Sequence, residues 1–241
     1  MPDCKNYIYY LKIKKATAIF LFSSLLVTFL FFSSCKKKPL VENTLFQLVD
    51  SSGINFENKV TDSREDNSFL YRNFYNGGGV AIGDINNDGR ADVFMTSNMG
   101  ENKLFLNKGN WKFEDISKQA NLRQDSMWST GVVMADVDGD GWLDIYVCNS
   151  GHINTGNRKN KLYINNHISP AVKGKGGGEV SFTESSAKYG LDVSGYCTQA
   201  SFFDYDMDGD LDCIIINNSP IPFGSLNYAN MRDADISKWN V

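Results

Sequence analysis

The chain has 241 residues, with 24 Lys and Arg, 28 Asp and Glu, and a formal net charge of −4. Seven of the basic residues and one of the acids lie at or before Lys38, so the 17 basic and 27 acidic side chains that follow give a net charge of about −10. This acidity argues against nucleic acid as a partner, because a phosphate-binding surface needs a basic patch.

The first predicted element is an export signal. Residues 1–15 carry four lysines, residues 16–32 are uncharged, and Ser33-Ser34-Cys35 precedes three more lysines. A basic region, an apolar region and small residues at a cleavage point are typical of a secretory signal. A plain transmembrane anchor is the alternative, because about 17 residues is the lower limit for spanning a bilayer. Both interpretations place the rest of the chain outside the cytosol.

The small residues before Cys35 resemble the lipobox of bacterial lipoproteins, although Phe32 is a looser fit than the usual Leu. The resemblance implies that residues 1–35 form a lipoprotein signal peptide and that Cys35 is lipid-modified as the mature N-terminus. We therefore expect an exported protein, anchored by lipid to the bacterial outer membrane or cell surface.

Residues 36–76 are interpreted as a linker with a lead-in strand. The stretch Phe46–Ile54 resembles two later stretches, residues 113–122 and 182–191, each of which ends a repeat. The first stretch therefore resembles the last strand of a unit without its beginning.

A nine-residue acidic loop follows three times, with oxygen-bearing side chains at positions one, three, five and nine and Gly at position six. Ca²⁺ takes six to eight oxygens, and the glycine allows the sharp turn that brings alternate side chains together. The residue at position seven contributes its backbone carbonyl, so its side chain need not be acidic. The predicted ligands are Asp84, Asn86, Asp88, Arg90 and Asp92; Asp136, Asp138, Asp140, Trp142 and Asp144; and Asp204, Asp206, Asp208, Asp210 and Asp212.

The sequence thus predicts about one Ca²⁺ per loop, three in this chain, with a structural role. The alternative for a single loop is an Asp/Gly-rich turn held by side-chain hydrogen bonds. Three copies in one register favour the metal. The first loop has three carboxylates and the second has four, so we expect the first to bind most weakly.

Short segments with a period of two flank every loop and predict half-buried strands. Four such strands and one loop make a unit of about fifty residues, which matches a blade of a β-propeller. The spacing from Asp84 to Asp136 is 52 residues and that from Asp136 to Asp204 is 68, the excess lying in two hydrophilic insertions. The predicted repeats are residues 77–128, 129–197 and 198–241, the third truncated.

The stretch from Gly77 to Asp84 and the loop after it resemble the FG-GAP or VCBS repeat of integrin α-subunit propellers and bacterial surface proteins. With Leu104–Asn107 and the closing Phe113 motif, the chain is similar to bacterial lipoproteins that carry VCBS repeats and an ASPIC/UnbV domain. The resemblance implies an all-β, integrin α-like propeller of four-stranded antiparallel blades, seven when complete and loaded with calcium. About three blades are present, so we expect an N-terminal piece whose remaining blades follow in the same chain.

The leading function is a non-enzymatic module that binds protein or carbohydrate at the cell envelope. The insertions of the second repeat, with Arg158, Lys159, Lys161, Lys173 and Lys175, are the candidate contact surface; a solvated loop is the alternative. The rival function is a calcium-stabilised propeller enzyme that acts on extracellular polysaccharide. The two histidines, His152 and His167, lie in the insertions and form no recognisable catalytic spacing.

Aromatic and sulfur-bearing side chains leave alternatives open. Trp128, Trp142 and Tyr196 are candidates for stacking on sugars, and core packing is the alternative. Cys148, Cys197 and Cys213 remain beyond Cys35, and an odd number without regular spacing indicates buried small side chains instead of a disulfide framework.

Overall fold

The structure is a computed structural model, and it describes residues 45–71, 73–122, 127–151, 158–167 and 180–218. The chain divides into two compact units, residues 1–48 and 49–241. The predicted signal peptide, Cys35 and the end of the third repeat lie outside the described residues. Within the described part, no helix is long and apolar enough to span a membrane.

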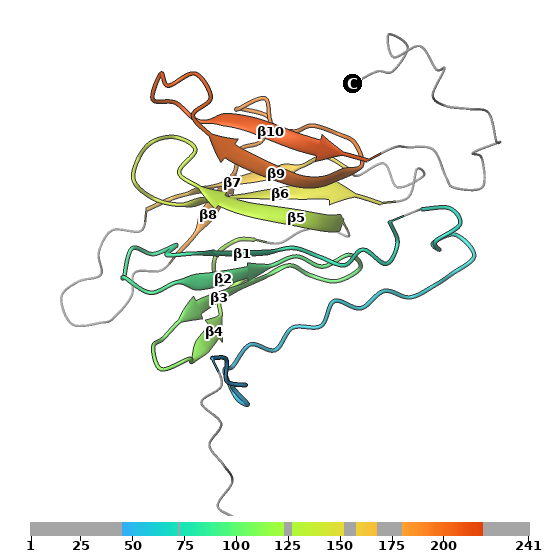
Figure 1. The fold of residues 1–241 in the computed structure, drawn as a ribbon, viewed down its shortest axis with the longest axis horizontal. Coiled ribbons are helices and arrows are strands. Elements are labelled where there is room, and N and C mark those ends of the chain that lie inside the picture. Colours follow the sequence, from blue (N-terminus) through green and yellow to red (C-terminus); the bar gives the residue numbers. More distant parts are fainter. Residues whose placement is uncertain (1–44, 72, 123–126, 152–157, 168–179, 219–241) are drawn as a thin grey trace, which may run out of the picture. The chain divides into compact units, whose positions relative to one another are not determined.

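Unit 49–241 is built from antiparallel β-sheets, which confirms the predicted all-β fold of propeller-like blades (Figure 1). Two sheets have four strands in chain order, and the third part is a two-stranded hairpin. The strands are β1 (Val80–Gly83), β2 (Asp92–Met95), β3 (Lys103–Asn107), β4 (Phe113–Asp115), β5 (Trp128–Ala135), β6 (Asp144–Ser150), β7 (Lys161–Asn165), β8 (Phe182–Glu184), β9 (Cys197–Phe203) and β10 (Asp212–Asn217).

The second sheet lies between the first sheet and the hairpin (Figure 1), so its strand β6 is buried on both faces. In β6, Ile145 and Val147 pack into the core shared with the first sheet, and Tyr146 and Cys148 pack into the core shared with the hairpin. All seven residues of β6 are buried. The expectation of half-buried strands is therefore wrong for β6, because alternate side chains each face a neighbouring sheet.

The first strands of successive sheets approach closely, and two glycines make the approach possible. A Cβ on Gly79 would lie 2.7 Å from the carbonyl oxygen of Thr130, and one on Gly131 would lie 2.4 Å from that of Thr198. The hydroxyl of Thr130 donates a 2.7 Å hydrogen bond to the carbonyl of Cys197. Gly79 and Gly131, each just before a valine in equivalent positions of the two sheets, thus lie against the backbone of the next sheet.

The lead-in stretch has no strand within residues 45–54, so that part of the expectation is wrong. A turn in this stretch nevertheless makes the same hydrogen bond to the first repeat that a turn of the first repeat makes to the second. The carbonyl of Ser52 accepts a hydrogen bond from the amide of Phe113 at 2.7 Å, as that of Ala120 does from Phe182 at 3.0 Å. The next residue has positive φ in both turns, 88° for Gly53 and 60° for Asn121.

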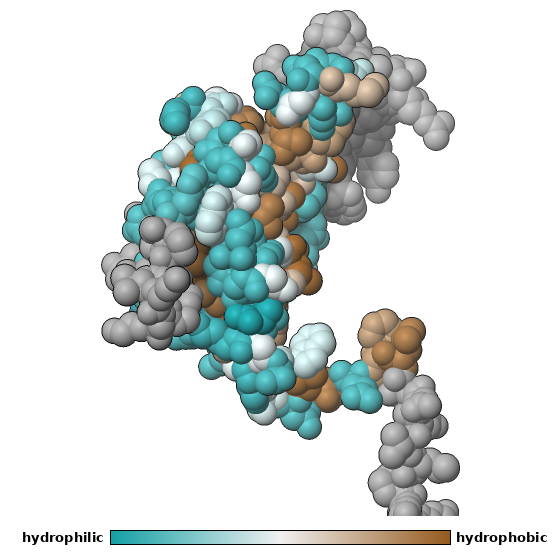
Figure 2. Space-filling model, turned by 90° about the vertical axis from the view of Figure 1, so that its left-hand side faces the viewer, coloured by the Kyte–Doolittle hydropathy of each residue, from teal (hydrophilic) through white to brown (hydrophobic). Residues whose placement is uncertain are grey.

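Hydrophilic residues cover most of the face in Figure 2, and hydrophobic residues form a band on it. Among the described residues, the terminal hairpin carries several exposed apolar side chains, including Phe203, Ile214 and Ile216. β10 pairs only with β9 in the part of the chain that the structure describes.

The two insertions of the second repeat begin at opposite ends of the strands of its sheet. β6 ends at Ser150, which pairs with Trp128, and the connection to β7 starts there. β7 runs back to Asn165, beside the acidic loop, and the connection to β8 starts at that end. The described residues at which the two insertions begin therefore lie at opposite ends of the strands. Residues 152–157 and 168–179, with Lys173 and Lys175, lie outside the described residues.

Candidate metal centre

Each acidic loop joins the first two strands of its sheet, between β1 and β2, β5 and β6, and β9 and β10. The glycine at position six has φ of 83° in Gly89, 89° in Gly141 and 97° in Gly209, as the sharp turn requires. Position four also has positive φ, and it is Asn87, Gly139 or Met207. The sequence pattern did not predict a positive φ at position four, because the residue type there varies between the loops.

The aspartate at position one accepts hydrogen bonds from two backbone amides, those of positions five and six, in all three loops. In the second loop, Asp136 accepts from Asp140 at 3.0 Å and from Gly141 at 2.8 Å. The aspartate at position five accepts from the amide of position seven, as Asp140 does from Trp142 at 2.8 Å. The same bonds recur around Asp84 and Asp88 in the first loop and Asp204 and Asp208 in the third.

In the first and second loops, the aspartate at position nine is buried and connects the loop to the third strand, whereas Asp212 of the third loop is exposed. Asp144 accepts from the amide of Val137 at 2.9 Å and from that of Asn165 at 2.8 Å. Asp92 accepts likewise from Ile85 and Asn107. Burial raises the pKa of both aspartates to about 6, although these amide donors oppose the shift.

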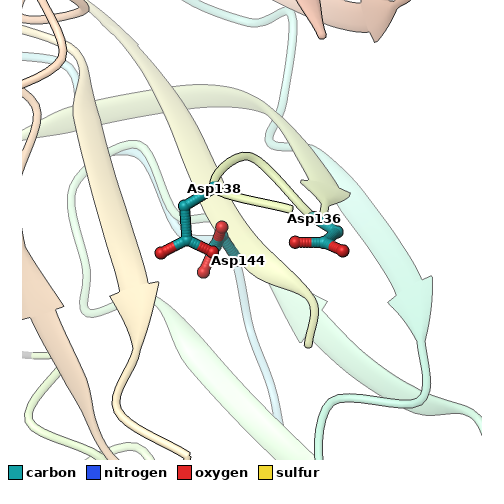
Figure 3. Close-up of side chains that lie close together, drawn as sticks. All are labelled: Asp136, Asp138 and Asp144. Carbon is teal, nitrogen blue, oxygen red and sulfur yellow. The ribbon is translucent and has the colours of Figure 1, made fainter. Parts of the chain in front are cut away.

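Carboxylates gather in the second and third loops in slightly different sets. Asp136, Asp138 and Asp144 place oxygens within 4.8 Å of one another, and the carboxylate of Asp136 faces the other two (Figure 3). In the third loop the set is Asp204, Asp206 and Asp208. The structure thus brings together six predicted ligands, and these sets leave out Asp140 and Asp212.

The donor set fits a hard cation, because every grouped atom is a carboxylate oxygen. Burial of Asp144 gives a second reason. A charged carboxylate loses hydration there, and a cation beside it would restore the favourable electrostatic environment.

The first loop differs because a cation from the chain already pairs with it. The guanidinium of Arg90 lies 2.6 Å from Asp88 and also donates to the carbonyl of Asn107 at 3.0 Å. Asn86 at position three donates its side-chain amide to Asp88 at 3.2 Å. These contacts occupy one oxygen of Asp88. The weaker binding of this loop stays a prediction.

The second loop has a neighbour that the sequence did not indicate. Nε2 of His167, just after β7, contacts the carboxylate of Asp140. The imidazole also stacks on the indole of Trp142, with ring centroids 5.8 Å apart and planes 7° from parallel. The observed contact of Trp142 is therefore with His167, beside its own loop. Asp140, which is missing from the gathered set, is held by His167.

An asparagine at the end of the third strand is a second feature that sequence reasoning missed. Asn165 is buried, and its side-chain amide donates to the carbonyls of Leu143 at 3.2 Å and Ile85 at 3.0 Å. Asn107 ends β3 at the equivalent position. The signal in the sequence is the repeated Asn-Lys-Leu-x-x-Asn, which starts at Asn102 and again at Asn160.

The other candidate residues lie away from the loops. Trp128 belongs to an aromatic core with Tyr71 and Phe74, and Tyr196 packs against it. Core packing is therefore the observed role of Trp128. Cys148 and Cys197 are buried free thiols, and Cys213 is a partly buried one. His152 lies outside the described residues.

Comparison with known proteins locates a repeat over the first two loops. Residues 64–147 match the FG-GAP-like repeat family. A 74-residue stretch is 39% identical to cartilage acidic protein 1 of Xenopus tropicalis, and a 72-residue stretch is 36% identical to the Homo sapiens protein. Each match covers 30% of this chain and 11% of the relative, so the chain spans a small part of these relatives.

Proposed function

We propose that the three acidic loops bind Ca²⁺ and that the ions stabilise an exported, non-enzymatic binding module. One observation carries the proposal: three carboxylates place oxygens within 4.8 Å of one another in the second loop, and three do so in the third. The match to FG-GAP-like repeats and the recurrence of the same turn in all three loops support it. The gathered carboxylates repel one another without a cation, so each ion is expected to stabilise the folded state.

Calcium titration with thermal unfolding tests the proposal. Ligand that binds only the native state adds about 2.7 kcal/mol per site at a hundred times Kd. We expect Ca²⁺ to raise the melting temperature and a chelator to lower it. Asp138→Asn removes one charge from the second loop, and because Asp138 caps no backbone amide in the structure, the ion-free fold should survive. The calcium-dependent rise should be smaller in this variant.

Glu57→Gln is the matched control, because it removes the same charge from an exposed position outside the loops. Its response to Ca²⁺ should equal that of the unmodified chain. A melting temperature indifferent to Ca²⁺, or an equal loss in both variants, would refute calcium binding at these loops.

The binding role extends the same proposal to partners. A protein or a glycan at the bacterial envelope is the expected ligand, and the lipid on Cys35 is the expected anchor. Arg158 and Lys159 supply the described basic groups of one insertion, and they lie at the end of the strands opposite the acidic loops. Lys159 pairs with Asp192, so the positive charge of this edge is partly balanced.

Carbohydrate and protein arrays separate this role from the enzymatic alternative. Saturable binding with the carbohydrate recovered intact supports a binding module. Release of shortened oligosaccharide would instead establish an enzyme that acts on polysaccharide and overturn the non-enzymatic proposal.

A further inference from the structure

We propose that the first and second loops bind their cations as one coupled pair and that the third loop binds independently. This inference rests on the proposed calcium function. It assigns the coupling to Asn87 and Asn165, neither of which belongs to the set of predicted ligands.

Two hydrogen bonds cross between the first two loops. The side-chain amide of Asn87, at position four of the first loop, donates to the carbonyl of Gly141 at 3.1 Å. That of Asn165 donates to the carbonyl of Ile85, at position two of the first loop, at 3.0 Å. The loops are therefore joined at two separate points.

Both bonds end on residues that hold predicted ligands. The amide of Gly141 donates to Asp136, and the amide of Ile85 donates to Asp92. The backbone amide of Asn165 donates to Asp144. A continuous chain of contacts thus connects Asp92, through Ile85 and Asn165, with Asp144. Asp92, Ile85 and Asp144 are fully buried, and Asn165 is nearly so.

The third loop lacks such a connection among the described residues. Position four of the second loop is Gly139, which has no side chain to reach the third loop as Asn87 reaches the second. No hydrogen bond joins the second and third loops in the part of the chain that the structure describes. Asp212 accepts from Tyr205, in its own loop.

Ordering explains how these bonds couple the sites. A cation in the first loop fixes Asn87 and Ile85, and they in turn fix Gly141 and Asn165 beside the second site. The second cation then meets a loop that is already partly ordered, so less conformational entropy is lost on binding. Coupling between sites is reciprocal, and typical values change affinity by about 5 to 150-fold.

Terbium luminescence can report on the second site by itself. Tb³⁺ takes oxygen ligands as Ca²⁺ does, and an adjacent excited indole sensitises its emission. Trp142 occupies position seven of the second loop, whereas the first and third loops have Arg90 and Asp210 there. Trp142→Phe in the full chain should remove the indole-sensitised signal and so identify its source.

Asp88→Asn weakens the first site but keeps one oxygen that can accept from the backbone amide of Arg90. Asp208→Asn makes the same change at the same position of the third loop. We expect Asp88→Asn to weaken Tb³⁺ binding at the second site by about fivefold or more. Asp208→Asn should change it by less than about twofold, as for independent sites. Asn87→Gly, which suits the positive φ, should reduce the effect of Asp88→Asn.

Equal effects of Asp88→Asn and Asp208→Asn, or no effect of either, would overturn the coupling. An undiminished effect of Asp88→Asn in the Asn87→Gly chain would refute its assignment to the inter-loop bonds. Absence of any indole-sensitised Tb³⁺ signal in the unmodified chain would instead count against cation binding at the second loop, so the two failures are distinguishable.

Discussion

At the scale of single residues, hydrogen bonds explain why the first two surface turns each contain a buried aspartate at position nine. Asp92 and Asp144 each accept from position two of the loop and from the last residue of the third strand. One carboxylate therefore fixes the turn against the sheet. The side chains at positions three and five accept no hydrogen bond from a residue of the third strand among the described residues, and they are the proposed ligands of the metal.

A second carboxylate pattern recurs at the fourth strand and predicts a dependence of stability on pH. Partial burial would raise the pKa of Asp115 and of Glu184. In both residues this is outweighed by donors from Ser117 or Ser186 and by Lys103 or Lys161, so both pKa values are lowered. A lowered folded-state pKa stabilises the fold above the unfolded-state pKa of about 4 and stops doing so as pH falls through the folded value.

Asp115→Asn should therefore lower the free energy of unfolding at pH 7 by at most about 1 kcal/mol, because the side chain is partly exposed and solvent-screened. The difference from the unmodified chain should shrink below about pH 4. Urea unfolding in chelator at several pH values measures it. Glu101→Gln is the control, since Glu101 lies farther from Lys103, at 3.6 Å against 3.0 Å for Asp115. A difference independent of pH would contradict the assignment.

At the scale of elements, the close approach of first strands limits what can replace glycine. Gly131 lies in β5, where a Cβ would meet the carbonyl oxygen of Thr198 at 2.4 Å and the side-chain oxygen of Gln199 at 2.0 Å. A side-chain end can move away, but a backbone carbonyl moves only with its strand. The spacing of β5 and β9 therefore depends on the absence of this Cβ.

Gly131→Ala should lower the free energy of unfolding by about 1 to 3 kcal/mol, the usual cost of overpacking. Adding Gln199→Ala removes the movable contact and leaves that with Thr198, so the double variant should recover little stability. Thermal unfolding compares the variants with Gln199→Ala alone. Full recovery in the double variant would show that the side chain, and not the backbone, sets the limit.

The elements were largely predictable from the sequence because their signals are local. Alternation on both sides of each loop predicted the strands, and the recurring Asp and Gly predicted the turns. His167 and Asn165 were not predicted as neighbours of loops, because their contacts join segments 27 and 80 residues apart with no local pattern. The prediction of a lead-in strand was wrong for a related reason: a strand needs a pairing partner, and the local sequence does not identify one.

At the scale of the whole molecule, the acidic loops and the start of the first insertion lie at opposite ends of the strands. His167 lies beside the second acidic loop, and Trp128 pairs with Ser150 at the other end of these strands. A partner bound at that other end need not touch a metal ligand. Calcium would then affect partner binding through the stability of the sheets.

The lipid anchor proposed for Cys35 is tested on the intact precursor expressed in a bacterium. Cys35→Ala should abolish lipid attachment, so the mass of the N-terminal peptide should lose its acyl chains and the protein should leave the lipoprotein fraction. Cys4→Ala, within the signal, is the control and should change neither. An unmodified Cys35 with the protein still in the membrane would support the transmembrane anchor instead.

The dual hydrogen bonding of the position-nine aspartate has a consequence for how such a chain can grow. Loop and third strand share one carboxylate within a single blade, as Asp92 shows with Asn107 and Asp144 with Asn165. A tandem duplication that copies a whole blade copies both ends of this bond, whereas a breakpoint between them separates donor from acceptor. Blade and acidic turn therefore form one heritable module, and gene-level expansion of the array is expected to preserve the two together.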